Sequence, residues 1–123
     1  MPRKRKYCSE LFSALANRLR IKILMELILE PMGVNELSRR VNAERTLVSH
    51  NLSILSKVDL VEYSTKGNMH IYHANDEMVP YLFYMMEDMV CEDCEIKKVT
   101  KELRKRNVKG EIRHKRTKCL YCG

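Results

Sequence analysis

Two short amphipathic segments, joined by only three residues, constrain the fold of this chain more than any other feature. Residues 34–41 and 45–58 each repeat apolar side chains every three or four positions, which predicts two helices. Their inward-facing positions are Val34, Leu37 and Val41 in the first segment and Val48, Leu52 and Leu55 in the second. The linker Asn42-Ala43-Glu44 is long enough only for a short turn, so the pair is predicted to form a helix-turn-helix.

The residues before this pair also have helical spacing. Residues 10–20 predict a first helix with Ser9 as its N-cap, and Asn17 either interrupts or caps this helix. A second helix starts near Ile21 and ends by Glu30, because a proline at position 31 disfavours a helical residue before it.

After the helix pair the hydrophobic period changes from helical to alternating. Leu60–Tyr63 and Met69–His73 alternate as strands do, and Lys66-Gly67-Asn68 predicts the tip of a hairpin between them. The predicted fold class is therefore mainly α with a β-hairpin (α+β). A hairpin that follows a helix-turn-helix is typical of a winged helix-turn-helix.

The next segment, Glu77–Val90, is predicted to be a helix capped by Asp76, and it is apolar on nearly all sides. Such a helix must be buried on two faces, and a second copy of the chain is the simplest cover for the outer face. The alternative is a central core helix in a monomer. The residues predicted to form a dimer contact here are Leu82, Met85, Met86 and Met89.

The positive charge of the chain is concentrated at its two ends. Residues 7–96 hold eight Lys or Arg against fourteen Asp or Glu, whereas residues 97–118 hold eleven Lys or Arg against two Glu. The stretch 1–8 is a short basic arm containing Arg3–Lys6. Basic ends favour a polyanionic partner, DNA or RNA, and the alternative is that they only increase solubility. No apolar run suits a membrane span or a signal peptide, so we expect a cytoplasmic protein (or a nuclear one) that binds no membrane.

A helix that reads DNA needs small polar or basic side chains on its outward face near its start. Residues 45–57 have this pattern beside the apolar inward face. The predicted DNA-binding residues in this helix are Arg45, Thr46, Ser49, His50 and Lys57, joined by Lys66 and Asn68 at the hairpin tip and by Arg39 and Arg40 on the preceding helix. Arg45 is suited to guanine, and the hairpin residues are suited to phosphates or the minor groove.

Two stretches resemble the ArsR (arsenic-repressor) family of winged-helix regulators. Leu47–Val61, reading LVSHNLSILSKVDLV, is similar to that family's recognition helix and following strand, and Leu15–Leu24, reading LANRLRIKIL, is similar to its opening helix. The resemblance covers about residues 9–90. It implies a homodimer built on the first and last helices, which adds Leu11 and Phe12 to the dimer contact. It also implies a palindromic operator and repression that an effector relieves.

The chain departs from the family at both of its familiar metal-sensing sites. Val34–Leu37, which matches the helix where many members carry C-x-C, has no cysteine. The last helix has no histidine to pair with Asp76. Neither sensor site is carried over, and His70 and His73 are interpreted as surface residues of the hairpin.

Four of the five cysteines form two C-x-x-C pairs, separated by 24 residues. Four thiolates suit a closed tetrahedral zinc site, which would organise residues 91–123, a basic segment without a core of its own. The predicted zinc ligands are Cys91, Cys94, Cys119 and Cys122. The pairs are alternatively redox-active dithiols or inert thiols. Cys8 is left over as a simple thiol or an exchanging ligand.

These features predict three segments: the arm 1–8, a DNA-binding and dimerisation domain 9–90, and the cysteine segment 91–123. The predicted function is a sequence-specific transcriptional regulator, a homodimeric repressor that binds double-stranded operator DNA. Its zinc site is structural or sensory. The alternative is an interaction module in a transcription or RNA-processing machine. No catalytic constellation stands out, so we expect neither an enzyme nor a small-molecule substrate.

Overall fold

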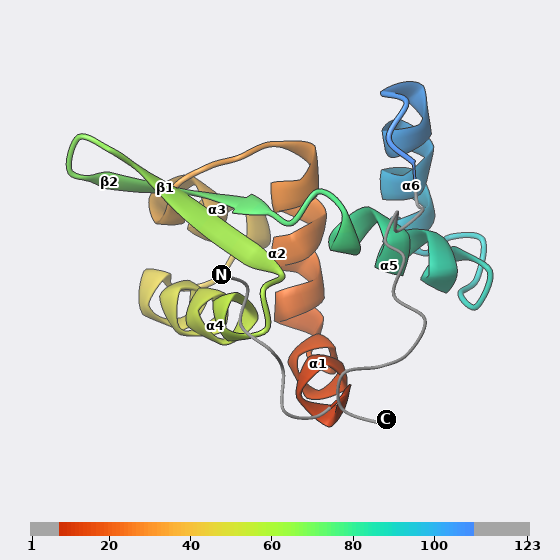
Figure 1. Cartoon of the computed structure of the whole chain (residues 1–123), viewed down its shortest axis with the longest axis horizontal. Helices are drawn as coiled ribbons and strands as arrows, with labels where there is room; N and C mark the ends of the chain where they lie inside the picture. The colour runs from red at the N-terminus through yellow and green to blue at the C-terminus, as the bar shows by residue number, and fades with distance from the viewer. Residues whose placement is uncertain (1–7, 110–123) are drawn as a thin grey trace.

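The structure is a computed structural model that describes residues 8–109. Most of the described chain is helical, with one antiparallel hairpin (Figure 1). In chain order the elements are α1 (Cys8–Leu15), α2 (Arg18–Leu29), α3 (Val34–Val41), α4 (Arg45–Lys57), β1 (Val61–Lys66), β2 (Met69–Ala74), α5 (Met78–Glu87) and α6 (Glu95–Lys105). The predicted fold class, mainly α with a β-hairpin in winged helix-turn-helix order, is confirmed.

The chain breaks between α1 and α2 at Asn17. The Asn17 side chain accepts a hydrogen bond from the backbone N–H of Arg20 at 3.1 Å, so Asn17 is the N-cap of α2. The predicted helix over residues 10–20 is therefore wrong in its extent, because the cap ends one helix and starts another. Ser9 lies inside α1, which already includes Cys8, so its predicted role as N-cap is also wrong.

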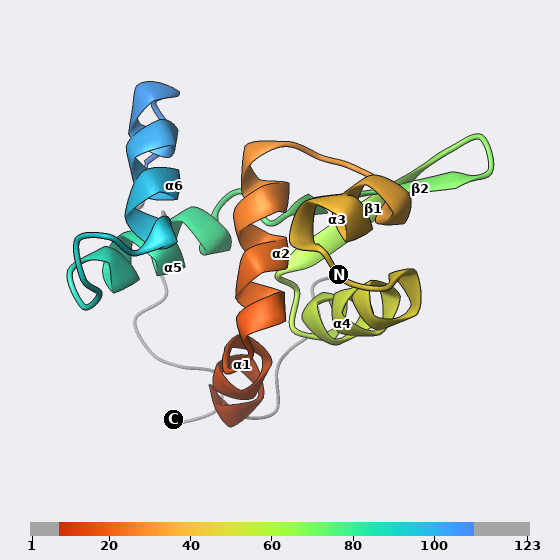
Figure 2. The ribbon, with the colours of Figure 1, turned by 180° about the vertical axis from the view of Figure 1, so that it is seen from behind.

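Helix α2 is the centre of the fold. It contacts every other helix and β2, and in Figures 1 and 2 it stands between the hairpin side and the α5–α6 side. Its side chains Ile23 and Leu24 are fully buried, as are Leu52 and Leu55 of α4 and Phe83 of α5. Burial of each such side chain contributes about 1.5–3 kcal/mol, so this shared core fixes α4 on the body.

The helix-turn-helix forms as the sequence predicts. Helix α3 has the predicted bounds, and Asn42 ends it in the left-handed conformation with φ 55°. Asparagine tolerates that conformation better than most residues. Helix α4 turns Val48, Leu52 and Leu55 fully inward, which confirms the predicted packing face.

The hairpin pairs Val61 with Ala74 and Lys66 with Met69, so both strands run further than predicted. Gly67 makes the turn at φ 64°, a conformation that favours glycine. Met32 exchanges two backbone hydrogen bonds with Tyr72, of 3.1 and 2.9 Å, on the other edge of β2. This contact anchors the base of the hairpin beside α3.

Helix α5 is shorter than the predicted Glu77–Val90, and its cap is a different residue. The Asn75 side chain accepts hydrogen bonds from the backbone N–H groups of Glu77 and Met78, each at 2.9 Å. The prediction of Asp76 as the cap is therefore wrong by one residue. Asp and Asn are both good caps, so sequence alone could not choose between neighbours.

Helix α6 packs on α5 and α2 and shares their core. Ile96 and Val99 are buried and Leu103 is 1% exposed, so this basic helix has one apolar face. The expectation that residues 91–123 lack a core is thus wrong for residues 95–105. None of the described helices is long and apolar enough to cross a membrane.

Candidate nucleic-acid interface

The outward face of α4 carries the side chains predicted to read DNA. Arg45, Thr46, Ser49 and His50 are all exposed, and so is Lys57 at the end of the helix. Since the opposite face of α4 is locked in the core, these side chains have a fixed direction. The structure therefore brings the predicted α4 residues together on one surface.

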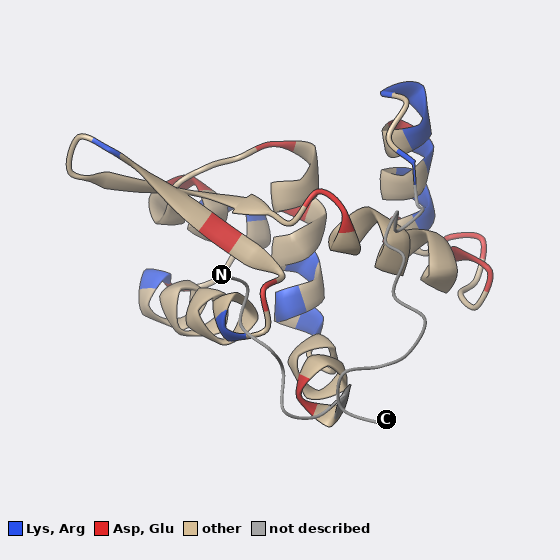
Figure 3. Ribbon diagram, in the orientation of Figure 1, with Lys and Arg blue, Asp and Glu red and all other residues tan. Residues whose placement is uncertain are grey.

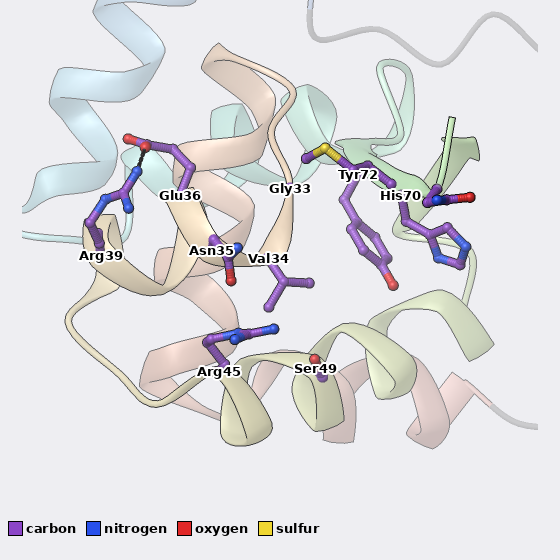
Figure 4. Close-up of a pocket in the computed structure, with 11 residues that line it drawn as sticks. Gly33, Val34, Asn35, Glu36, Arg39, Arg45, Ser49, His70 and Tyr72 are labelled. Carbon is purple, nitrogen blue, oxygen red and sulfur yellow. Dashed lines mark hydrogen bonds and ion pairs between the residues drawn. The ribbon is translucent and has the colours of Figure 1, made fainter. Parts of the chain in front are cut away.

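A hollow of about 540 Å³ separates the start of α4 from the hairpin. Arg45 and Ser49 line it from α4, and Asn68, His70 and Tyr72 line it from the turn and β2. Figure 4 shows Arg45 and Ser49 below this hollow, with Tyr72 and His70 above it. The helix and the wing thus face a common concave surface.

The wing contributes an aromatic cluster that the sequence reasoning missed. The rings of Tyr63 and His70 are stacked, with centroids 4.2 Å apart, and Tyr72 lies 5.5 Å from Tyr63. Burial raises the pKa of the Tyr72 hydroxyl above its usual value. Tyr63 and Tyr72 are directly opposed in the hairpin register. Alignment of the two alternating strands about the Gly67 turn would therefore have predicted this aromatic pair from the sequence.

The tip of the wing extends away from the body (Figure 1). Lys66 and Asn68 flank the turning Gly67, and both are exposed. Both side chains are therefore accessible at the wing tip, and their contacts with phosphates or the minor groove stay a prediction.

The two arginines of α3 differ in how firmly they are held. Arg40 reaches the carboxylates of Glu26, Glu30 and Glu36 at 3.3, 3.2 and 2.9 Å, and these hydrogen bonds, Glu36 first, raise its pKa. Arg39 pairs with Glu36 alone, and its side chain is 72% exposed. The two arginines hold the pKa of Glu36 below its usual value. Of the two, Arg39 is the better placed to turn toward a phosphate.

A polar contact fixes the middle of α4 to α2 and was not predicted. Asn51 is 3% exposed, and its side-chain oxygen accepts a hydrogen bond of 2.8 Å from the Arg20 guanidinium. Its amide donates to the backbone oxygen of Leu47 at 2.9 Å. Because the two residues are 31 positions apart, no local pattern marks the pair.

The predicted dimer contact falls into exposed and covered side chains. Phe12 of α1 is 68% exposed, Met85 of α5 is 49% exposed, and Met89 just beyond α5 is 72% exposed. The other three, Leu11, Leu82 and Met86, are half-buried against the core. The exposed three are large apolar side chains that folding of one subunit does not bury.

The first C-x-x-C pair lies in the turn between α5 and α6. The Cys94 N–H donates to the Cys91 backbone oxygen at 3.1 Å, and neither thiol is in a disulfide. Cys91 is exposed and Cys94 half-buried. The other predicted ligands, Cys119 and Cys122, and the arm 1–7 lie outside the described residues. Within residues 8–109 no group of three or more potential metal ligands gathers.

Charge is distributed unevenly over the described residues. Residues 8–94 hold eight Lys or Arg against thirteen Asp or Glu, and residues 95–109 hold seven against two. Figure 3 shows the cations mainly along α6 and at the start of α2, with few on α4 and the wing. The face of α4 that is predicted to read DNA is therefore poor in positive charge compared with α6.

A helix-turn-helix followed by a two-stranded wing, with a polar outward face on the second helix, defines a winged helix-turn-helix protein. Residues 17–63 match the family model described as bacterial regulatory protein, arsR family. Over residues 17–63, which run from Asn17 at the start of α2 into β1, the chain is thus similar to the ArsR family. Proteins of this family are transcription regulators and not enzymes, which confirms the expectation that this chain is not an enzyme.

Individual relatives agree with this assignment. The chain is 31% identical over 84 residues to the transcriptional repressor SmtB homolog of Synechocystis sp.. The aligned residues make up 68% of this chain and 64% of that protein, so the chain spans slightly less than two thirds of its relative. The structure is similar to that of NolR from Sinorhizobium fredii, with a TM-score of 0.63, 26% identity and coverage of 66% of this chain and 81% of that one. It is also similar to a homodimeric winged helix-turn-helix DNA-binding domain from Mycobacterium bovis, with a TM-score of 0.52, 29% identity and coverage of 54% and 61%.

Proposed function

We propose that this protein is a homodimeric transcriptional repressor that binds a palindromic operator in the cytoplasm. The observation that carries the proposal is the exposed polar face of α4 beside the wing, held in place by a fully buried opposite face. That geometry suits a helix placed in the major groove with a wing over the adjacent backbone. Similarity to the ArsR family favours this function over an interaction module.

Individual side chains are suited to distinct contacts. Arg45 at the start of α4 has the reach and donor geometry for a bidentate contact with guanine. Thr46, Ser49 and His50 follow it on the same exposed face and are suited to bases or phosphates. Lys66, at the wing tip, is suited to the backbone or the minor groove, and contributes sequence-independent affinity.

Dimerisation is supported by the apolar side chains that one subunit leaves exposed. Phe12, Met85 and Met89 are each about half exposed or more, and an interface between two copies of the chain would cover such large apolar side chains. The related domain from Mycobacterium bovis is homodimeric, and the Synechocystis relative is a repressor. A two-fold dimer presents two copies of α4 to the DNA, so its operator would be palindromic.

We also propose that zinc binds Cys91, Cys94, Cys119 and Cys122. The turn at the first pair leaves one thiol exposed and both unoxidised, which fits two ligands of a tetrahedral thiolate site. Cys119 lies ten positions after Lys109, a distance of at most about 33–36 Å when the chain is extended, whereas α6 is about 16 Å long. The chain is therefore long enough for the second pair to reach the first.

Charge complementarity supports the same site. Residues 88–95 around the first pair contain four Asp or Glu and no Lys or Arg, while residues 113–118 before the second pair contain four Lys or Arg and no Asp or Glu. Opposite charges bring the two segments together before metal closes the site. A redox-active dithiol remains the competing chemistry.

The DNA-binding proposal is tested by selection from a pool of random duplexes with the full-length protein. We expect an enriched motif with two-fold symmetry, whose half-sites are about one helical turn apart, and a complex of two chains per duplex by light scattering. An enriched motif without symmetry, or one chain per duplex, would contradict the dimeric mode. Failure to enrich any sequence would contradict the function itself.

The zinc proposal is tested by metal analysis of protein purified without chelator or added metal. We expect one zinc per chain, lost when Cys91 or Cys119 is replaced by serine and retained in the matched variant Cys8→Ser. Zinc-free protein that contains a disulfide when isolated without reductant would instead support the redox alternative.

A further inference from the structure

Helix α6 carries a row of lysines that the operator contacts do not use. Lys98, Lys101 and Lys105 are exposed at spacings i, i+3 and i+7, which places them on one face of the helix, opposite the buried Ile96 and Leu103. None of the three has an ion-pair partner among residues 8–109, unlike Lys97 and Arg104 of the same helix, which pair with Glu92 and Glu87.

This lysine row is mounted rigidly on the body. Arg104 and Thr100 donate hydrogen bonds to the Glu87 carboxylate of α5, the latter at 2.6 Å. Beyond the helix, the Tyr84 hydroxyl donates to the Val108 backbone oxygen at 2.7 Å, and Arg106 donates to the Leu29 backbone oxygen at 2.6 Å. The helix that carries the row is therefore fixed on the body, so the three lysines share one face, which the lysines of a solvated basic tail do not.

The row does not face the duplex that α4 would read. In Figures 1 and 2, α2 stands between α6 and the α4–wing side, and Figure 3 shows the cations of α6 at the opposite end of the molecule from the wing tip. A straight duplex bound along α4 would therefore lie on the opposite side of the body from α6. A polyanion bound to the lysine row is thus a different segment from the duplex that α4 would read.

We propose that Lys98, Lys101 and Lys105 form a second DNA-binding surface that holds a duplex segment other than the operator. The lysines are separated by about 4.5 and 6 Å along the helix axis, comparable with the 3.4 Å axial spacing of phosphates on one strand. Residues 95–109 contain no aromatic side chain on which unpaired bases would stack, so the surface suits duplex backbone and not single-stranded RNA.

The charge balance of the molecule gives an independent reason. Non-specific affinity for DNA comes from phosphate neutralisation, yet the described body up to residue 94 has a net negative charge. Lys98 also lines a hollow of about 360 Å³ together with Lys22, where Glu26 and Glu95 balance part of the positive charge, so the excess of cations is concentrated on the outer face of α6. A regulator with this arrangement holds its operator at one end and a neighbouring stretch of DNA at the other.

This inference rests on the proposed operator binding, and a bead assay tests the two separately. A duplex obtained by selection is attached to beads and saturated with full-length protein, and a fluorescent 30-base-pair duplex of unrelated sequence is then added. We expect the loaded beads to capture the second duplex, with capture falling as salt rises. The triple variant K98Q/K101Q/K105Q should capture less than a third as much while binding the selected duplex with unchanged affinity.

The matched control is the triple Lys→Arg variant at the same positions, which keeps the charge and should capture as the unchanged protein does. If the Gln variant captures as much as the unchanged protein, or if loaded beads capture no second duplex, the second surface is refuted. If the same beads instead retain an acidic peptide such as polyglutamate and no second duplex, the surface binds acidic protein and the proposal is likewise overturned. Protein that fails to load on the selected duplex would refute the proposed function, a distinct outcome.

Discussion

The Arg20 guanidinium donates a 2.8 Å hydrogen bond to the buried side-chain oxygen of Asn51, and so joins the start of α2 to the middle of the helix predicted to read DNA. The same guanidinium donates to the backbone oxygen of Ala14 at 2.7 Å, at the end of α1. One side chain therefore ties three helices together. The orientation of α4 depends on this polar contact as well as on apolar packing.

Replacement of Asn51 by alanine should destabilise the fold by about 1–3 kcal/mol, because the half-buried Arg20 donor loses its acceptor and the Leu47 carbonyl loses its donor. The free energy of unfolding in urea measures the loss. Ser53→Ala, an exposed change on the same helix, is the control and should stay within about 0.5 kcal/mol. An Asn51→Ala variant as stable as this control would show that water replaces the contact.

The shape of the wing turn depends on Gly67. Its φ of 64° is unfavourable for residues with a Cβ, although an added Cβ would meet no atom within 4 Å. Gly67→Ala should therefore cost about 1–2 kcal/mol from backbone strain alone. Gly67→Asn should cost less, because asparagine tolerates this region. Equal unfolding free energies for the two variants would mean that the turn changes its conformation at no cost.

The parts of the fold that sequence predicts are those whose signal is local. The apolar spacing around Leu52 and the alternation around Tyr72 lie within single elements, and both faces appear in the structure where they were expected. The Arg20–Asn51 contact and the packing of α6 on α5 depend on residues far apart in the chain, so no periodicity marks them. At the start of α5, Asn75 and Asp76 are equivalent by propensity, and tertiary context selects Asn75.

The α5–α6 contact should weaken in acid. Hydrogen bonds from Arg104 and then Thr100 hold the pKa of Glu87 below its usual value. Its contribution is complete above the pKa of an unfolded glutamate and is lost as pH falls through the lower folded value. Glu87→Gln should thus cost about 1–3 kcal/mol at pH 7 and progressively less toward pH 3.

Urea unfolding at pH 7, 5, 4 and 3 measures this difference. The control is Glu102→Gln. Glu102 forms an exposed ion pair with Arg106, one helical turn further along α6, so its replacement should change the free energy of unfolding by less than about 0.5 kcal/mol at any pH. A Glu87→Gln effect that does not depend on pH would assign the loss to packing instead of to the ion pair.

Variants of α4 should affect the recognition of bases, whereas variants of the wing should affect contacts with the DNA backbone. Arg45→Ala should lower affinity for the selected duplex about 5- to 150-fold and relax the preference at one base pair, as expected for loss of a bidentate contact. Lys66→Ala should weaken all sequences alike and reduce the salt slope by about one. Competition titrations at several salt concentrations measure both effects. Equal losses on selected and unrelated duplexes for Arg45→Ala would remove it from base recognition.

Thiol counting should report the state of the two C-x-x-C pairs. With zinc bound by four thiolates, one of the five cysteines, Cys8, should react rapidly with a thiol reagent under native conditions. After addition of a strong chelator all five should react, because loss of metal frees the other four. The Cys8→Ser variant should give none before chelation and four after it. Five rapid thiols before chelation would contradict the zinc site, and thiols that appear only after reduction would identify disulfides in its place.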